Sequence, residues 1–328
     1  MQVKSFWDNL PRPFFVLAPL ADVTDPAFRK LIAKYSKPAG PAVVYTEFVS
    51  ADGLALAPEE GRKKLIRDLE YGEAERPIVA QFFTATPLHM EKAAALAKEL
   101  GFDGVDINMG CPAETIVWQG AGSNLIKSPS LAIELIAAAK QGAGGLPVSV
   151  KTRLGYNQDE VESWVPALLS ADPVALVLHA RTKKEMSKVP ARWERVRRAV
   201  EIRNELGSQT LILGNGDLKD IEDAKIKVKE SGADGGMLGR AIFGRPWLFA
   251  QREPGLEERL RVAVEHAKLF EEMLGDIKSF AIMKKHFKAY VEGFAGAKEL
   301  RMELMETKSA AEVEEVISRF LQRLPATL

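Results

Sequence analysis

The chain has 328 residues and a mass of 36.1 kDa, with 45 basic and 45 acidic side chains, so its formal net charge at pH 7 is zero. This balance excludes a globally basic nucleic-acid coat protein, although it allows a local basic face. A hydrophobic fraction of 46% and one cysteine indicate a globular protein with its own core and without an intramolecular disulfide.

No targeting, membrane or metal signal is expected. The opening MQVKSFWDNLPRPFFVLAPLADVTD is too short and too often interrupted by Pro, Asp and Asn to be a signal peptide. No apolar run approaches the roughly 20 residues that span a bilayer. The four histidines show no metal-ligand spacing. We therefore expect a monomeric cytoplasmic enzyme that contacts no membrane and holds no metal.

Eight short apolar runs rich in β-branched residues alternate with helix-like segments. Such runs are typical of strands that are buried on both faces, as in parallel sheets. They are 14–17, 43–46, 78–82, 104–107, 148–152, 175–178, 210–213 and 235–238. Between them, Thr86-Pro87 begins a predicted helix that ends at Gly101, and Ser128-Pro129 begins another that ends at Gly142.

Eight βα units in about 240 residues predict a (β/α)8 TIM barrel over residues 1–252. A doubly wound open sheet is the alternative, but the first βα turn has no G-x-G-x-x-G motif. Strand-like runs cease after 247–249, and three apolar stripes at helical spacing follow. They predict a small helical C-terminal domain over residues 253–328.

Polar residues are concentrated where the predicted strands end, which is where barrel enzymes carry their chemistry. The side chains at these ends are Glu47, Gln81, Asn108, Lys151, His179, Asn215 and Arg240. The loops 214–217 and 239–240 follow the last two strands, where barrels commonly bind a phosphate through backbone N–H groups. Their glycines and Arg240 together predict a phosphorylated cofactor.

Two of the polar residues suggest the kind of reaction. Lys151 would be a cation inside the mouth, which needs an anionic partner such as a reduced flavin ring. Cys111, the single thiol, follows a strand end in Gly110-Cys111-Pro112 rather than standing in an apolar stripe. A thiol with a pKa of about 8.5 is mostly protonated near neutral pH, so it can serve as a proton donor.

The residues in this order resemble the tRNA-dihydrouridine synthase family. The most specific segment is DINMGCP at 106–112, followed by GAGSNL at 120–125. Around it stand APLA at 18–21, QFF at 81–83, VKTRLG at 150–155, HART at 179–182, NGD at 215–217 and GRAIFGRPW at 239–247. The helical part is similar to the family at KKH, 284–286, and GAKELR, 296–301.

The resemblance implies an FMN-dependent barrel enzyme that reduces the C5–C6 double bond of a uridine in tRNA, with NADPH as the reductant. It implies that Cys111 is the catalytic proton donor and that Asn108 and Arg181 hold the uracil. The positions that it assigns to flavin binding are Pro19, Leu20, Ala21, Gln81, Lys151, His179, Asn215, Gly216, Asp217, Gly239 and Arg240. The target base would have to be turned out of the RNA into the mouth.

Two basic segments are candidates for contact with the RNA. Residues 181–203 contain nine basic and three acidic side chains, and residues 278–301 contain six and two. An alternative is a flavin enzyme for free pyrimidines, similar to dihydroorotate dehydrogenase, which would explain neither the helical domain nor these segments. A non-catalytic RNA-binding protein is a further alternative, and it would not explain Cys111 and Lys151 at strand ends.

Overall fold

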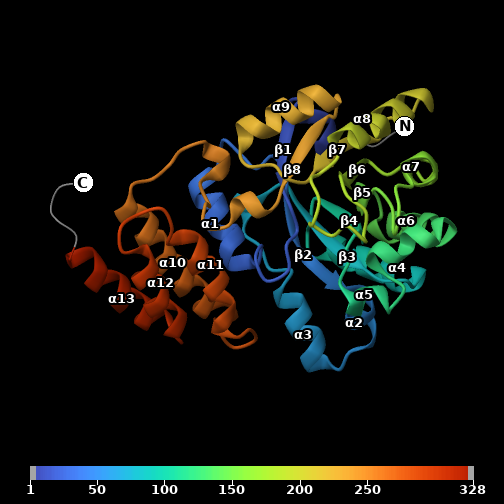
Figure 1. The fold of residues 1–328 in the computed structure, drawn as a ribbon. Coiled ribbons are helices and arrows are strands. Elements are labelled where there is room, and N and C mark those ends of the chain that lie inside the picture. Colours follow the sequence, from blue (N-terminus) through green and yellow to red (C-terminus); the bar gives the residue numbers. More distant parts are fainter. Residues whose placement is uncertain (1–4, 324–328) are drawn as a thin grey trace.

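A computed structural model describes residues 5–323 as a closed parallel barrel that is followed by a group of helices (Figure 1). The strands are hydrogen-bonded in the order β1-β8-β7-β6-β5-β4-β3-β2, and Val16 bridges Val43 to join β1 to the β2 edge. Their bounds are β1 (Phe14–Leu17), β2 (Val44–Ser50), β3 (Ile78–Phe83), β4 (Gly104–Met109), β5 (Val148–Arg153), β6 (Ala175–His179), β7 (Leu211–Asn215) and β8 (Gly235–Leu238). The predicted TIM barrel with C-terminal helices is confirmed.

Several strands continue further than the sequence predicted. β2 runs to Ser50 and includes Glu47, because a bulge between Tyr45 and Phe48 lets it follow β3. Asn108, His179 and Asn215 likewise lie inside β4, β6 and β7 rather than after them. The residues that carry the polar side chains of the mouth still belong to the strands. The change from apolar to polar residues along the sequence therefore does not mark the end of a strand.

Helices cover the outside of the barrel and form the C-terminal group. Those of the barrel are α1 (Pro26–Ser36), α2 (Ala51–Leu56), α3 (Glu59–Arg67), α4 (Pro87–Glu99), α5 (Glu114–Val117), α6 (Pro129–Ala143), α7 (Val161–Leu169), α8 (Trp193–Glu205) and α9 (Ile221–Ser231). The C-terminal group is α10 (Leu256–Leu274), α11 (Met283–Tyr290), α12 (Ala297–Glu306) and α13 (Ala310–Gln322). The sequence showed three apolar stripes here, and α12 is the helix that they missed.

Gly142 was expected to end a helix, but it lies within α6. A Cβ atom at Gly142 would stand 1.9 Å from the carbonyl oxygen of Glu91 in α4, so this glycine allows the two helices to pack closely. The helix ends instead at Gly144, which has a left-handed backbone with φ of 52°. Local sequence could not separate these roles, because the approach of α4 is a tertiary contact.

The C-terminal helices pack against α1, on one side of the barrel (Figure 1). Their apolar core includes Ala27 of α1 and Trp247, which lie in the predicted barrel segment, so the division at residue 253 stays a prediction. The two parts approach closely at Gly244, where a Cβ atom would lie 2.6 Å from the backbone of Ala289. None of the helices in 5–323 is long and apolar enough to cross a membrane.

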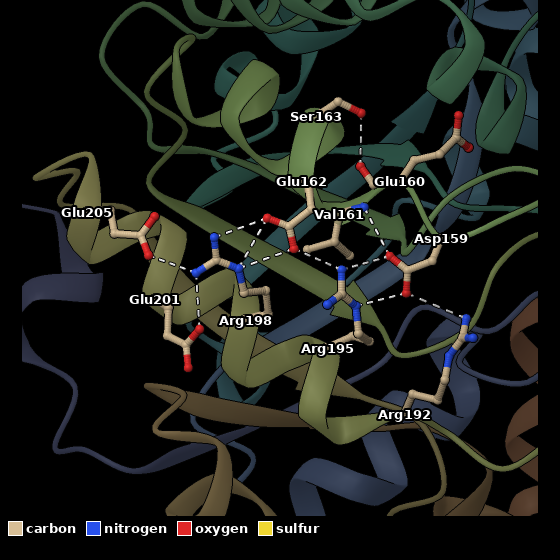
Figure 2. Close-up of polar contacts among 10 residues, drawn as sticks. All are labelled: Asp159, Glu160, Val161, Glu162, Ser163, Arg192, Arg195, Arg198, Glu201 and Glu205. Carbon is tan, nitrogen blue, oxygen red and sulfur yellow. Dashed lines mark hydrogen bonds and ion pairs between the residues drawn. The ribbon is translucent and has the colours of Figure 1, made fainter.

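Arg195 and Arg198 of α8 pair with carboxylates, mainly with Asp159 just before α7 and Glu162 in the first turn of α7 (Figure 2). Arg195 contacts Asp159 at 2.9 Å and Glu162 at 3.1 Å, and Arg198 contacts Glu162 at 3.1 Å. Arg198 also reaches Glu205, within its own helix, at 2.7 Å. Asp159 and Glu162 thus lie directly against the basic segment 181–203. Carboxylates of the same chain therefore neutralise much of the positive charge of residues 192–203.

Candidate active site

A cavity of about 760 Å³ opens at the C-terminal ends of the strands. All of the predicted site residues except Ala21 line it, namely Pro19, Leu20, Gln81, Asn108, Cys111, Lys151, His179, Arg181, Asn215, Gly216, Asp217, Gly239 and Arg240. Ala21 lies in the exposed turn after Leu20 and is not part of the lining. No group of three or more His, Cys, Asp or Glu side chains in 5–323 is placed to hold a metal ion.

Alternation along the strands explains why these side chains converge. Successive residues of a strand point to opposite faces, so Lys151 faces the interior together with Ser149 and Arg153. Arg153 also lines the cavity, although the sequence analysis gave it no role. The alternation of side chains along β5 places Arg153 on the same face as Lys151, and this pattern could have identified it from the sequence.

Arg153 holds the loops on either side of it. Its Nε donates to the carbonyl of Gly110 at 2.7 Å, and its Nη1 donates to the carbonyls of Thr182 at 3.1 Å and Met186 at 3.2 Å. Met186 and Ser187 in turn line the cavity. The guanidinium therefore connects the loop that carries Cys111 to the loop after β6.

The Cys111 loop is closed by its own backbone. The carbonyl of Cys111 accepts from the N–H of Ser123 at 3.0 Å, and a Cβ atom at Gly122 would lie 2.8 Å from that carbonyl. The left-handed backbone of Gly122, with φ of 60°, makes this return possible. Burial raises the pKa of the Cys111 thiol, so the sulfur carries its proton at neutral pH.

Lys151 and His179 occupy the floor of the cavity. Burial lowers the pKa of Lys151 to about 8, with Arg153 adding to the effect. No described residue accepts a hydrogen bond from the Lys151 ammonium, which leaves this cation for a ligand. Burial and the surrounding cations hold the pKa of His179 well below its ordinary value, so the imidazole is neutral.

Asp217 joins two arginines at the rim. Its Oδ2 pairs with Arg181 and its Oδ1 accepts from Arg240 at 2.9 Å. Burial alone would raise the pKa of Asp217, but the Arg181 contact lowers it overall, so the carboxylate stays ionised. Arg181 also donates to the carbonyl of Val189 at 2.6 Å. The sequence assigned Asp217 to a cofactor, and the structure shows that it also fixes both guanidinium groups.

The glycine loops after β7 and β8 expose backbone N–H groups to the cavity. A Cβ atom at Gly216 would stand 3.1 Å from the His179 ring, so no larger residue fits there. At Gly239 such a Cβ would meet Ala18 at 3.7 Å and Leu20 at 3.9 Å, which is ordinary van der Waals contact without a clash. No described backbone oxygen accepts from the N–H groups of Gly216, Gly239 or Arg240. These free donors next to Arg240 have the chemistry of a phosphate site.

Comparison with known proteins agrees with this geometry. The family model described as dihydrouridine synthase (Dus) matches residues 16–324. The chain belongs to the dihydrouridine synthase family. A probable tRNA-dihydrouridine synthase of Staphylococcus aureus (strain MRSA252) is 40% identical over 97% of this chain and 96% of its own length. Probable tRNA-dihydrouridine synthase 2 of Bacillus subtilis (strain 168) is 40% identical over 97% of both chains. The prediction of an enzyme of this family is confirmed.

Solved structures of other proteins share the fold at low sequence identity. Histamine dehydrogenase from Rhizobium sp. 4-9 superposes with a TM-score of 0.53 and 13% identity, over 78% of this chain and 48% of that one. A 2-naphthoyl-CoA reductase complex superposes with a TM-score of 0.51 and 13% identity, over 72% of this chain and 49% of that one. At these identities the likeness is one of fold.

The protonation of Cys111 can be measured directly, because it is the only cysteine of the chain. Burial raises its pKa, so the alkylation rate with iodoacetamide, followed by mass spectrometry against pH, should have its midpoint above the ordinary value of about 8.5. Lys151 lowers this pKa, so Lys151→Met should move the midpoint further up. The urea-unfolded protein is the matched control. A folded midpoint equal to or below the unfolded one would contradict the assignment.

Proposed function

We propose that this dihydrouridine synthase reduces the C5–C6 double bond of a uridine in tRNA to 5,6-dihydrouridine, with bound FMN and with NADPH as the reductant. The observation that carries the proposal is the convergence of a protonated thiol, an unpaired lysine and two glycine loops on one cavity. The names of the relatives, tRNA-dihydrouridine synthases, support the tRNA substrate.

The residues of the cavity fit FMN. The free N–H groups of Gly216, Gly239 and Arg240, together with the Arg240 side chain, would hold its phosphate. Lys151 would face the flavin ring, where its unpaired ammonium favours the negative charge of the reduced form. Neutral His179 and Gln81 would supply hydrogen bonds from the same floor, and Asn215 would stand beside the phosphate loops.

The side chains divide the reaction between them. When bound and reduced, FMN supplies the hydride that the uracil receives at C6. Cys111 gives its Sγ proton to C5, which completes the addition of two hydrogens across the double bond. Asn108 and Arg181 line the cavity near Cys111 and would hold the polar edge of the uracil. A thiol that stays protonated at neutral pH is suited to this role.

Fewer basic side chains are available to contact RNA than the sequence suggested. Arg195 and Arg198 of α8 are paired with carboxylates (Figure 2), and so is Arg203. By contrast, no described carboxylate lies within 4.0 Å of the ammonium groups of Lys183 or Lys188. On α11 the same holds for Lys284 and Lys288. We therefore assign tRNA contact to the loop after β6 and to α11, on two sides of the mouth.

Substitution of Gly239 tests the phosphate site. A Cβ atom there meets no protein atom closer than 3.7 Å, so Gly239→Leu should fold, fill the space beside the phosphate loops and lose most of its FMN. Gly255→Leu is the matched control, because a Cβ at Gly255 meets nothing within 4 Å and lies outside the cavity. The measurement is flavin absorbance per mole of purified protein. A Gly239→Leu protein with a full complement of flavin would place the phosphate elsewhere.

Charge reversal on α11 tests the RNA surface. Lys284→Glu with Lys288→Glu should weaken tRNA binding and reduce its salt dependence, because fewer counterions are released from the RNA. The matched control is Lys225→Glu with Lys229→Glu on α9, away from the cavity. Affinities are measured by filter binding at two salt concentrations. Equal effects of the two double variants would remove α11 from the interface.

The reaction itself is tested with Cys111→Ala. The variant should keep its flavin and should be reduced by NADPH at the wild-type rate, since neither step needs an acid at the uracil. Its anaerobic oxidation by excess tRNA should slow by a factor on the order of 10² to 10⁴, the usual contribution of general acid catalysis. Stopped-flow absorbance measures both steps. Oxidation of the wild-type enzyme by orotate but not by tRNA would instead indicate a free-pyrimidine reductase.

A further inference from the structure

A buried carboxylate lies behind the cavity and has no part in the roles assigned above. Asp106 is fully buried on β4, two residues before Asn108. Its Oδ1 accepts from the Ser149 hydroxyl at 2.5 Å, and its Oδ2 accepts from Nε2 of Gln81 at 2.6 Å. Burial raises the pKa of Asp106 to about 6, so at neutral pH the carboxylate is ionised and can only accept hydrogen bonds. Gln81 must therefore turn its amide nitrogen toward Asp106 and its oxygen away.

The orientation is passed on to the next amide. Oε1 of Gln81 accepts from Nδ2 of Asn108 at 3.2 Å, which directs Oδ1 of Asn108 to the opposite side. There Oδ1 accepts from two backbone donors, the N–H of Gly110 at 3.1 Å and the N–H of Cys111 at 2.9 Å. Asp106, Gln81, Asn108 and the two backbone N–H groups thus form a row of hydrogen bonds. The row begins at a group that only accepts and ends at groups that only donate. One orientation of both amides satisfies every member.

We propose that Asp106 is the positioning residue of this site: through Gln81 and Asn108 it fixes the backbone of Cys111 and makes Asn108 a hydrogen-bond donor toward the substrate. The role in the reaction rests on the function proposed above. The polarity of the row is a property of the chain alone, so it can be tested without turnover.

The polarity has a consequence for the ligand. Both lone pairs of Asn108 Oδ1 are occupied by the Cys111 loop, and one Nδ2 hydrogen is used by Gln81. The group that Asn108 has left for the cavity is its second N–H. This donor matches a carbonyl oxygen of a pyrimidine and leaves an exocyclic amino group without a partner. If the hydrogen bonds of the row ran in the opposite direction, Asn108 would present its oxygen to the cavity instead. Its Nδ2 would then face the backbone N–H donors of the Cys111 loop.

Asp106→Asn is the decisive variant, because it keeps the shape of the side chain but lets it donate as well as accept. Both polarities then become possible, and the Cys111 loop loses its fixed acceptor. Alkylation of Cys111 by iodoacetamide in the flavin-loaded protein should become faster by roughly 3- to 10-fold, the factor that corresponds to the net value of one hydrogen bond. Ser149→Ala removes the other contact of the same carboxylate and should stay within about twofold of wild type, since Gln81 keeps its acceptor.

A double-variant cycle separates this relay from a simple effect of charge. If Asp106 acts through Asn108, the variant with both Asp106→Asn and Asn108→Ala should be alkylated at the rate of Asn108→Ala alone. If the lost charge acts directly on the thiol, the two factors should multiply, and the proposal is wrong. Should Asp106→Asn fail to fold, Gln81→Met breaks the row at its next member and should give the same faster alkylation and the same cycle. Unchanged alkylation in a folded variant also overturns the proposal.

Kinetics with tRNA add a readout that a purely structural role would not move. When its flavin has been reduced beforehand, Asp106→Asn should be oxidised by tRNA more slowly than the wild-type enzyme. The effect should appear mainly in kcat, because the tRNA surface on α11 is untouched. If the wild-type enzyme forms no dihydrouridine in tRNA, the proposed function fails, while the alkylation cycle still decides the polarity of the row.

Discussion

The inward-facing polar side chains of a parallel barrel must find partners, because the interior excludes water and an unpaired buried polar group is destabilising. In this protein the constraint shapes the whole mouth. Asp106, Gln81 and Asn108 satisfy one another in a row, and Arg181, Asp217 and Arg240 do so at the rim. Lys151 is the exception among the described residues of the floor, because no protein group accepts from its ammonium. Most polar groups of the mouth that are named here are thus paired within the protein, and the Lys151 ammonium is not.

The same requirement separates structural charge from functional charge. The α8 arginines and the carboxylates of 159–162 form a paired network on the outside of the barrel (Figure 2), so they contribute to the packing of α7 on α8. No described carboxylate lies within 4.0 Å of the ammonium groups of Lys183 and Lys188 on the loop after β6, or of Lys284 and Lys288 on α11. A net charge of zero thus coexists with local positive potential on either side of the cavity mouth.

The appended helices are fixed to the barrel at the same rim. Lys278 pairs with Glu47 of β2 at 2.9 Å and with Asp68 at 2.8 Å, and Gly244 allows close contact with α11. Burial of Lys278 is compensated by the two carboxylates, which hold the start of the α11 region beside the end of β2. These contacts join the α11 region, where we propose RNA contact, to the strand end beside the cavity.

The sequence by itself determined the eight strands, the two helical starts at proline and the polar residues of the mouth, because each depends on a local pattern of apolar residues, caps and turns. It also brought Cys111, Lys151 and the glycine loops to one end of the barrel, since parallel strands all end on the same side. Only the tertiary structure decided what each polar group contacts. The orientation of Gln81 and Asn108, the neutralisation of Arg195 and the role of Gly142 depend on residues 25 to 51 positions away, brought together by register and helix packing. Ala21 was assigned to flavin binding by the family resemblance, whereas in the structure it lies in an exposed turn outside the cavity lining. The hydrogen-bond and ion-pair partners of a polar side chain depend on packing between distant segments, so a local sequence pattern does not predict them.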